Sequence, residues 1–117
     1  MQNVKQYDLE ERTLKFARNI RSFIKLLPKN ISNFEDSKQL VRSSGSVGAN
    51  YIEANESLSK KDFVMRIMIC RKEAKESEYW LNLIEVDSMR SINLREELID
   101  EAVQLRKIFG SILEKSK

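Results

Sequence analysis

The residues that could perform acid–base or metal chemistry in this chain are carboxylates and one thiol, because its 117 residues include no histidine and a single cysteine. Without His there is no imidazole base, no His metal ligand and no His-based catalytic triad. Bundles that hold two metal ions use Glu-x-x-His motifs, which the chain lacks. Glu53, Glu73 and Glu76 remain as an all-carboxylate alternative. We predict no enzyme activity, no cofactor and no metal site.

Two other features could suggest chemistry, and each has a plainer interpretation. Cys70 falls on the apolar seam of a predicted helix, which is typical of a buried, inert thiol. A lone Cys also cannot form an intramolecular disulfide or a multi-cysteine zinc site. The segment from Ser44 to Gly48 is rich in Gly but lacks the Lys and the spacing of a phosphate-binding loop.

Basic side chains are the remaining groups that could bind a ligand, namely the phosphates of a nucleic acid. The net charge of +3 is mild, so a solvated charged face is the alternative for a single copy. Repeated around a symmetric oligomer, the same residues would form a ring of positive charge. The candidate nucleic-acid-binding residues are Arg12, Lys15, Arg18, Arg21, Lys25, Lys60, Lys61 and Arg66.

The elements that must position these residues are helices. Apolar residues recur with the helical period of 3.6, and Gly and Pro together number four. Pro28 ends the first helix, and Ser59 and Asn93 have the spacing of N-caps for the third and fourth. The predicted helices span residues of about 8–27, 36–56, 60–86 and 94–114. We predict one domain over residues 1–117, an all-α, antiparallel up-down-up-down four-helix bundle.

Two of the predicted helices carry more than one packing face. The second contains Gly45 and Gly48, each costing about 1 kcal/mol relative to Ala, which favours a close approach by another backbone. The third has an apolar seam and further apolar residues on its other side, with Trp80 between. The alternatives are a small-residue surface without a role and a wide core stripe. The predicted oligomer interface comprises Arg42, Ser46, Asn50, Glu53, Met65, Ile69, Glu73, Glu76 and Trp80.

The sequence gives no indication of a membrane. No apolar run approaches the roughly 18 residues of a membrane-spanning helix, and Met1 to Asp8 has neither the apolar core nor the cleavage site of a signal peptide. We therefore expect a cytoplasmic protein.

Two stretches carry a resemblance to a known family: residues 42–54, Arg-Ser-Ser-Gly-Ser-Val-Gly-Ala-Asn-Tyr-Ile-Glu-Ala, and residues 72–81, Lys-Glu-Ala-Lys-Glu-Ser-Glu-Tyr-Trp-Leu. With Lys61 and Phe63 between them, they resemble the four-helix-bundle proteins encoded by 23S ribosomal RNA intervening sequences. Accessory variability determinant proteins of diversity-generating retroelements are relatives of that family. The residues that match the motifs are Arg42, Ser43, Asn50, Glu53, Glu73, Glu76 and Trp80.

The resemblance implies a homopentameric barrel without enzymatic activity. It also implies a role in binding nucleic acid, above all RNA, or in partnering a reverse transcriptase. Together with the two-faced helices, it leads to the hypothesis of a non-enzymatic homo-oligomer that binds RNA or a nucleoprotein partner. The alternative is a structural or protein-partner module that binds no nucleic acid.

Overall fold

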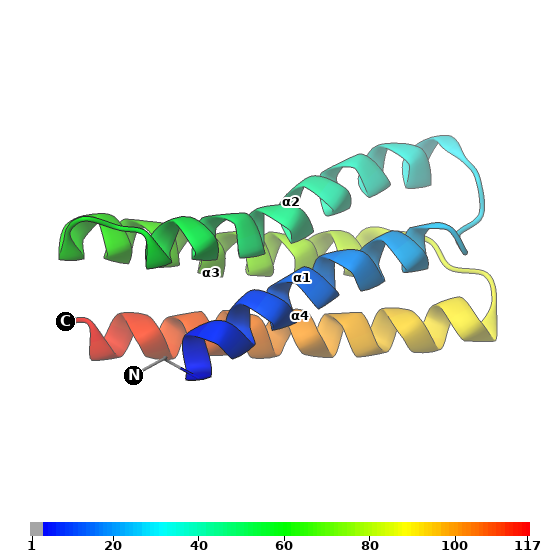
Figure 1. Cartoon of the computed structure of the whole chain (residues 1–117). Helices are drawn as coiled ribbons and strands as arrows, with labels where there is room; N and C mark the ends of the chain where they lie inside the picture. Colours follow the sequence, from blue (N-terminus) through cyan, green and yellow to red (C-terminus); the bar gives the residue numbers. More distant parts are fainter. Residues whose placement is uncertain (1–3) are drawn as a thin grey trace.

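Four helices follow one another in the computed structural model, which describes the backbone of residues 4–117 and the side chains of residues 9–117. They are α1 (Val4–Ile24), α2 (Ile31–Asn55), α3 (Lys60–Leu83) and α4 (Met89–Lys115). Successive helices run antiparallel, and α1 crosses the bundle obliquely, with more of its length against α2 than against α4 (Figure 1). The predicted all-α four-helix bundle is confirmed.

The first two helices begin earlier than the sequence pattern indicated. α1 starts four residues before the predicted start and ends three before the predicted end. Its chain tightens into a turn before Pro28, where the amide of Leu27 donates to the carbonyl of Ile24 at 3.2 Å. The predicted start of the second helix at about residue 36 is wrong, because α2 begins at Ile31. The Asn30 side chain accepts a hydrogen bond from the amide of Asn33 at 2.8 Å and so caps α2.

Of the two N-caps predicted from the sequence, the one for α3 is confirmed and the one for α4 is wrong. Ser59 caps α3 as predicted, accepting from the amide of Asp62 at 3.1 Å. α3 ends three residues before the predicted end. The predicted capping box from Asn93 to Glu96 is wrong, because α4 begins five residues earlier. There Ser88 and Ser91 each accept a hydrogen bond from the other's amide.

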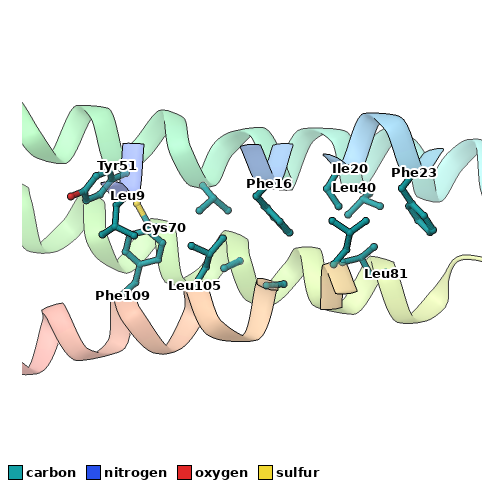
Figure 2. Packing of buried hydrophobic residues seen from close by; sticks show 14 of the residues in the cluster. Leu9, Phe16, Ile20, Phe23, Leu40, Tyr51, Cys70, Leu81, Leu105 and Phe109 are labelled. Carbon is teal, nitrogen blue, oxygen red and sulfur yellow. The ribbon is translucent and has the colours of Figure 1, made fainter. Parts of the chain in front are cut away.

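The core is one cluster of apolar side chains from all four helices (Figure 2). The apolar period of 3.6 residues predicts buried seams on α3 and α4, and these are confirmed from Ile67 to Ile84 and from Leu98 to Phe109. The same period predicts that the buried stripe of α2 includes Tyr51 and Ile52, which is wrong at Ile52, because that side chain is 50% exposed. Thr13 and Ser43 are buried although polar, because each hydroxyl donates to a carbonyl of its own helix.

A glycine fixes how closely α1 approaches α2. A Cβ atom built on Gly48 would lie 2.8 Å from Oγ1 and 3.1 Å from Cβ of Thr13. At Gly45 the nearest neighbour of such an atom is the end of the flexible Arg21 side chain, 3.8 Å away. The expected close backbone approach therefore exists at Gly48 and is absent at Gly45.

One asparagine joins the two loops at the end of the bundle where α1 meets α2. Asn33 is 3% exposed. Its Nδ2 donates to the carbonyls of Pro28 at 3.0 Å and Glu85 at 2.9 Å, and its Oδ1 accepts from the amide of Glu85 at 2.9 Å. The start of α2 is thus fixed to the segment between α3 and α4.

The structure tests only part of what the sequence indicates about membranes and targeting signals. No helix within residues 4–117 is long and apolar enough to cross a bilayer. The expected absence of a signal peptide concerns Met1 to Asp8, of which residues 1–3 and the side chains of residues 4–8 lie outside the described part.

Candidate functional site

A row of cations follows α1 and the loop after it. Between Arg12 and Phe34 the chain has six basic residues and no Asp or Glu. Four of them are exposed on α1 and the turn that ends it: Lys15, Arg18, Arg21 and Lys25. We call these four residues the α1 cation row. Arg21 also donates from Nη1 to the carbonyl of Ala17 at 3.1 Å. Spaced three or four residues apart, they follow one side of the helix, and Lys15, at the start of the row, shares a hollow with Glu97 and Glu101 of α4.

Arg12 belongs to the same stretch but is engaged with α4. Its Nε and Nη2 donate to the two carboxylate oxygens of Glu101 at 2.7 and 2.9 Å, and Nη2 also donates to Gln104 at 3.0 Å. A bidentate pair of this kind is stronger and more directional than a single charged contact. Arg12 therefore ties α1 to α4, and its positive charge is matched by a carboxylate.

The other predicted cations lie toward the far end of the bundle. Lys60 and Lys61 are exposed at the start of α3, beside the loop from α2, whereas Lys25 lies at the opposite end (Figure 1). Arg66 is partly buried and donates to Oδ1 of Asn50 at 3.0 Å. The C-terminal end of the α1 cation row and the start of α3 thus lie at opposite ends of the bundle, whereas the first turns of α1 lie toward the α3 cations, since Glu10 accepts a hydrogen bond from Asn55 at 2.8 Å.

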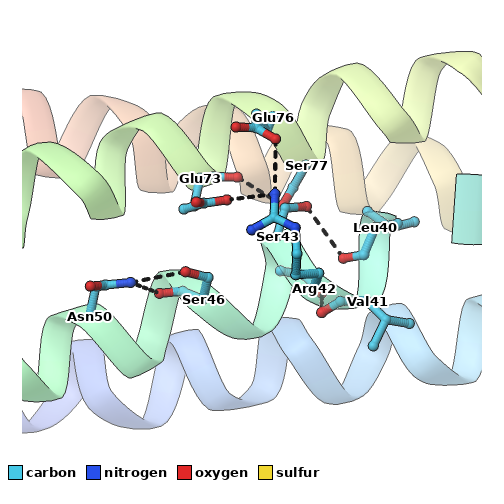
Figure 3. Close-up of polar contacts among 10 residues, drawn as sticks. Leu40, Val41, Arg42, Ser43, Ser46, Asn50, Glu73, Glu76 and Ser77 are labelled. Atoms are coloured by element: carbon cyan, nitrogen blue, oxygen red, sulfur yellow. Dashed lines mark hydrogen bonds and ion pairs between the residues drawn. The ribbon is translucent and has the colours of Figure 1, made fainter. Parts of the chain in front are cut away.

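The polar face of α2 lies against α3 of the same chain (Figure 3). Arg42 bridges Glu73 at 3.4 Å and Glu76 at 3.1 Å. At the next residue of each helix, the hydroxyls of Ser43 and Ser77 are 2.9 Å apart, and both residues are fully buried. Within one copy of the chain, the neighbour of this part of α2 is therefore α3.

The remaining members of that polar set complete what we call the α2–α3 polar seam, defined by Arg42, Ser43, Ser46, Asn50, Arg66, Glu73, Glu76 and Ser77. Asn50 donates from Nδ2 to the carbonyl and the hydroxyl of Ser46, each at 2.9 Å. Glu53 is exposed. A role of these residues between copies of the chain stays a prediction.

The outer side of α3 carries exposed apolar residues that the core does not use. Met65, Met68 and Tyr79 are 48%, 56% and 59% exposed, and Ile69 is partly buried. Trp80 differs from them, because it packs against the core cluster and meets Tyr79 edge-on with ring centroids 5.0 Å apart. We call Met65, Met68 and Tyr79 the outer α3 face.

Sequence reasoning missed a groove at the end of the bundle, beside the loop from α1 to α2. Its volume is about 940 Å³, and its lining includes Ile24, Leu27, Ile31, Phe34, Lys29 and Lys38. Ile31 is 85% exposed and Phe34 is 65% exposed. The available indication was Asn30, a favoured N-cap residue, directly before Ile31. Recognising that cap would have placed both apolar residues on the first turn of a helix.

The surroundings of Cys70, Glu73 and Glu76 do not favour covalent or metal chemistry. Burial raises the pKa of the Cys70 thiol to about 12, so at neutral pH the thiol is protonated and unreactive. Glu73 and Glu76 each form an ion pair with Arg42. In the part of the chain that the structure describes, no group of three or more Cys, Asp or Glu residues is arranged to hold a metal ion.

Comparisons with known proteins agree on one family. A model of the 23S rRNA-intervening sequence protein family matches residues 5–111. A crystal structure of a protein of unknown function from the S23 ribosomal protein family of Bacteroides thetaiotaomicron is 32% identical, with a TM-score of 0.81, and the match covers 95% of this chain and 99% of that one. Among curated proteins, none matches the chain.

Proposed function

The chain belongs to the 23S rRNA-intervening sequence protein family, and from that premise we propose that it is a non-enzymatic, homo-oligomeric helical bundle that binds RNA. The observation that carries this proposal is the α1 cation row, which lies in a stretch without a single acidic residue. Exposed Lys and Arg neutralise phosphates and release counterions from the nucleic acid. Binding of this kind needs no catalytic group.

Assembly would multiply the effect of the cation row. Four cations on one copy predict weak binding, because each phosphate contact contributes modestly and is screened by salt. A closed symmetric oligomer repeats the row once per copy, so a long RNA can contact several rows at the same time. The resemblance implies five copies, and the outer α3 face offers apolar surface for contact between them.

The first experiment measures the mass of untagged protein by size-exclusion chromatography with light scattering, recording absorbance at 260 and 280 nm together. Five copies of 13.7 kDa give about 68 kDa, and excess absorbance at 260 nm indicates bound nucleic acid. Clean protein at the oligomer mass would favour a protein partner. A mass of 13.7 kDa would contradict the oligomer.

A charge-reversal series tests the RNA surface itself. The triple variant Arg18→Glu, Arg21→Glu and Lys25→Glu should lose most RNA affinity and flatten its dependence on salt concentration. The matched control is Arg71→Glu, Lys107→Glu and Lys115→Glu, all exposed positions outside the row. Both triples change the charge equally, so equal losses would show that total charge rather than the row governs binding. Unchanged binding in the first triple would refute the proposed surface.

A protein partner is the second candidate function, and the outer α3 face favours it. Met and aromatic side chains are enriched where proteins meet, and Met65, Met68 and Tyr79 are exposed in a single copy. The resemblance implies a reverse transcriptase as one such partner. RNA association that is weak and insensitive to salt would favour this function over the first.

A further inference from the structure

We propose that the groove at the α1–α2 end of the bundle binds an unpaired base of a single-stranded nucleic acid, with Phe34 as the surface on which the base stacks. This inference rests on the nucleic-acid binding proposed above and names the class of nucleic acid: single strands or single-stranded regions, in preference to duplex. Below, "the end groove" means the groove lined by Ile24, Leu27, Lys29, Ile31, Phe34 and Lys38.

The end groove has the size and lining of a ligand site. Its volume of about 940 Å³ lies in the range of pockets that bury small molecules, roughly 300–1,000 Å³. The wall is largely apolar, and Phe34 presents an aromatic ring that is 65% exposed. An exposed aromatic residue beside a hollow apolar surface is typical of a recognition site rather than of a solvated helix start.

The charges around the groove suit a phosphate backbone. The α1 cation row ends at Lys25, and the chain continues through Lys29 on the groove wall. On the other side, Nζ of Lys38 lies 4.7 Å from the centroid of the Phe34 ring. Lys38 also pairs with Glu35 at 3.4 Å, and both side chains are more than half exposed. An exposed pair of this kind is weak, so a phosphate can compete for the ammonium.

The backbone that carries Phe34 is held in place before any ligand binds. The amide of Phe34 donates to the carbonyl of Asn30 at 2.9 Å, and the Asn30 side chain caps the same turn. Asn33, between them, is fixed to the carbonyls of Pro28 and Glu85. Little ordering of the backbone therefore remains to be done on binding, which favours affinity.

The chemistry selects single strands for a geometric reason. In a duplex both faces of each base are covered by its neighbours, and only the phosphates and groove edges are accessible. An unpaired base can leave the stack and lie against an aromatic ring while adjacent phosphates contact lysines, which is how sequence-tolerant single-strand binders work. The α1 cation row can contact the phosphates of a duplex and of a single strand alike, whereas Phe34 can stack only with an unpaired base of a single strand.

The test measures fluorescence anisotropy with three labelled probes: an unstructured 12-nucleotide RNA, the DNA of the same sequence, and a 12-base-pair RNA duplex. Phe34→Ala should weaken RNA or DNA single-strand binding by roughly tenfold, the loss of one base–aromatic stack, and leave duplex binding unchanged. Phe34→Trp should restore single-strand binding. The control is Leu58→Ala, a fully exposed apolar residue outside both the end groove and the outer α3 face, which should change neither affinity.

Comparison of the RNA and DNA single strands shows which part of the nucleotide is recognised. Equal affinities indicate that the site contacts base and phosphate, whereas a preference for RNA indicates contact with the 2′-hydroxyl. If wild-type protein binds the probes but Phe34→Ala binds them equally well, the inference is overturned while the RNA-binding function stands. If wild-type protein binds no probe, the function itself fails. A fall in oligomer mass in Phe34→Ala would also overturn it, by showing that a second copy fills the groove.

Discussion

Gly48 and Gly45 lie three residues apart on α2, and only Gly48 is in close contact with another helix. Ala at residue 48 would place a methyl group 2.8 Å from the Thr13 hydroxyl, which is buried and already donates to the carbonyl of Leu9. Relief of that clash requires α1 to move. We expect Gly48→Ala to lower the free energy of unfolding by about 1–3 kcal/mol, as measured by urea denaturation.

Gly45→Ala is the matched control. The new methyl group would meet only the flexible end of the Arg21 side chain, at an ordinary contact distance of 3.8 Å, so the substitution should raise the free energy of unfolding by up to about 1 kcal/mol through helix propensity. Equal effects of the two substitutions would show that α1 does not rest on Gly48. The sequence predicted a close approach for both glycines, because propensity does not reveal which face of α2 another helix covers.

The buried thiol gives a pH prediction. Burial raises the pKa of Cys70 from 9.0 to about 12, so between these values the unfolded chain loses this proton while the folded chain keeps it. The stabilisation is complete below pH 9 and disappears as the pH rises toward 12. The free energy of unfolding should therefore fall by up to about 1.4 kcal/mol per pH unit from this group.

Other groups titrate in the same range, so the measurement is a comparison of slopes. Denaturant unfolding at pH 9, 10 and 11 should show a steeper decline for the wild type than for Cys70→Ala. Parallel declines would contradict the raised pKa. Burial of Cys70 was predictable from its place on the apolar seam, because a period of 3.6 residues over a long helix is a strong signal.

Between elements, the Ser43–Ser77 pair fixes α2 against α3. Each hydroxyl is fully buried, and the two oxygens are 2.9 Å apart. Replacement of one Ser by Ala removes the hydrogen bond between the two hydroxyls, worth about 0.5–1.5 kcal/mol, and leaves the other hydroxyl bonded only to a carbonyl of its own helix. Ser43→Ala and Ser77→Ala should each destabilise the protein, and the double variant should be less destabilised than the sum.

A double-mutant cycle from thermal or urea unfolding measures this coupling. Additive effects would indicate that the hydroxyls act only on their own helices, through the carbonyls of Leu40 and Glu73. Lys38→Ala serves as the reference for a contact of little value, since the Lys38–Glu35 pair is largely exposed and should contribute less than about 1 kcal/mol.

Helix boundaries show where sequence reasoning about elements was insufficient. The long apolar repeats of α3 and α4 predicted their buried faces. The true starts of α2 and α4 were missed because the apolar residues of their first turns are exposed and do not continue the buried repeat. Asn30 and Ser88 cap these helices, but a cap residue looks like any polar loop residue until its partner amide is placed. Ser59 was recognised because a strongly periodic segment follows it directly.

For the whole molecule, the outer α3 face decides how copies of the chain could meet. Met68 is 56% exposed, so Met68→Glu should leave the helicity of a single copy intact and change its stability by no more than about 0.5 kcal/mol. In an apolar interface the same carboxylate would be desolvated. We expect the mass measured by light scattering to fall to that of a monomer, 13.7 kDa.

Leu58→Glu is the control for Met68→Glu, because Leu58 is fully exposed in the loop from α2 to α3. An unchanged mass in Met68→Glu would exclude the outer α3 face as the interface. Assembly could not be separated from packing by sequence alone: on the polar face of α2, Arg42 and Asn50 already contact α3 of the same chain, while Glu53 stays exposed. A repeat pattern shows that a face is suited to packing without showing whose helix packs there.

Because Cys70 is buried, the native protein has no thiol that reacts readily with a reagent in solution. Cys70 is the only cysteine, it is fully buried, and its thiol stays protonated at neutral pH. Leu58→Cys, at a fully exposed position in the loop from α2 to α3, would supply the one thiol that a maleimide dye can reach. Paired dyes on different copies would then report distances across an assembly while every native core residue stays in place.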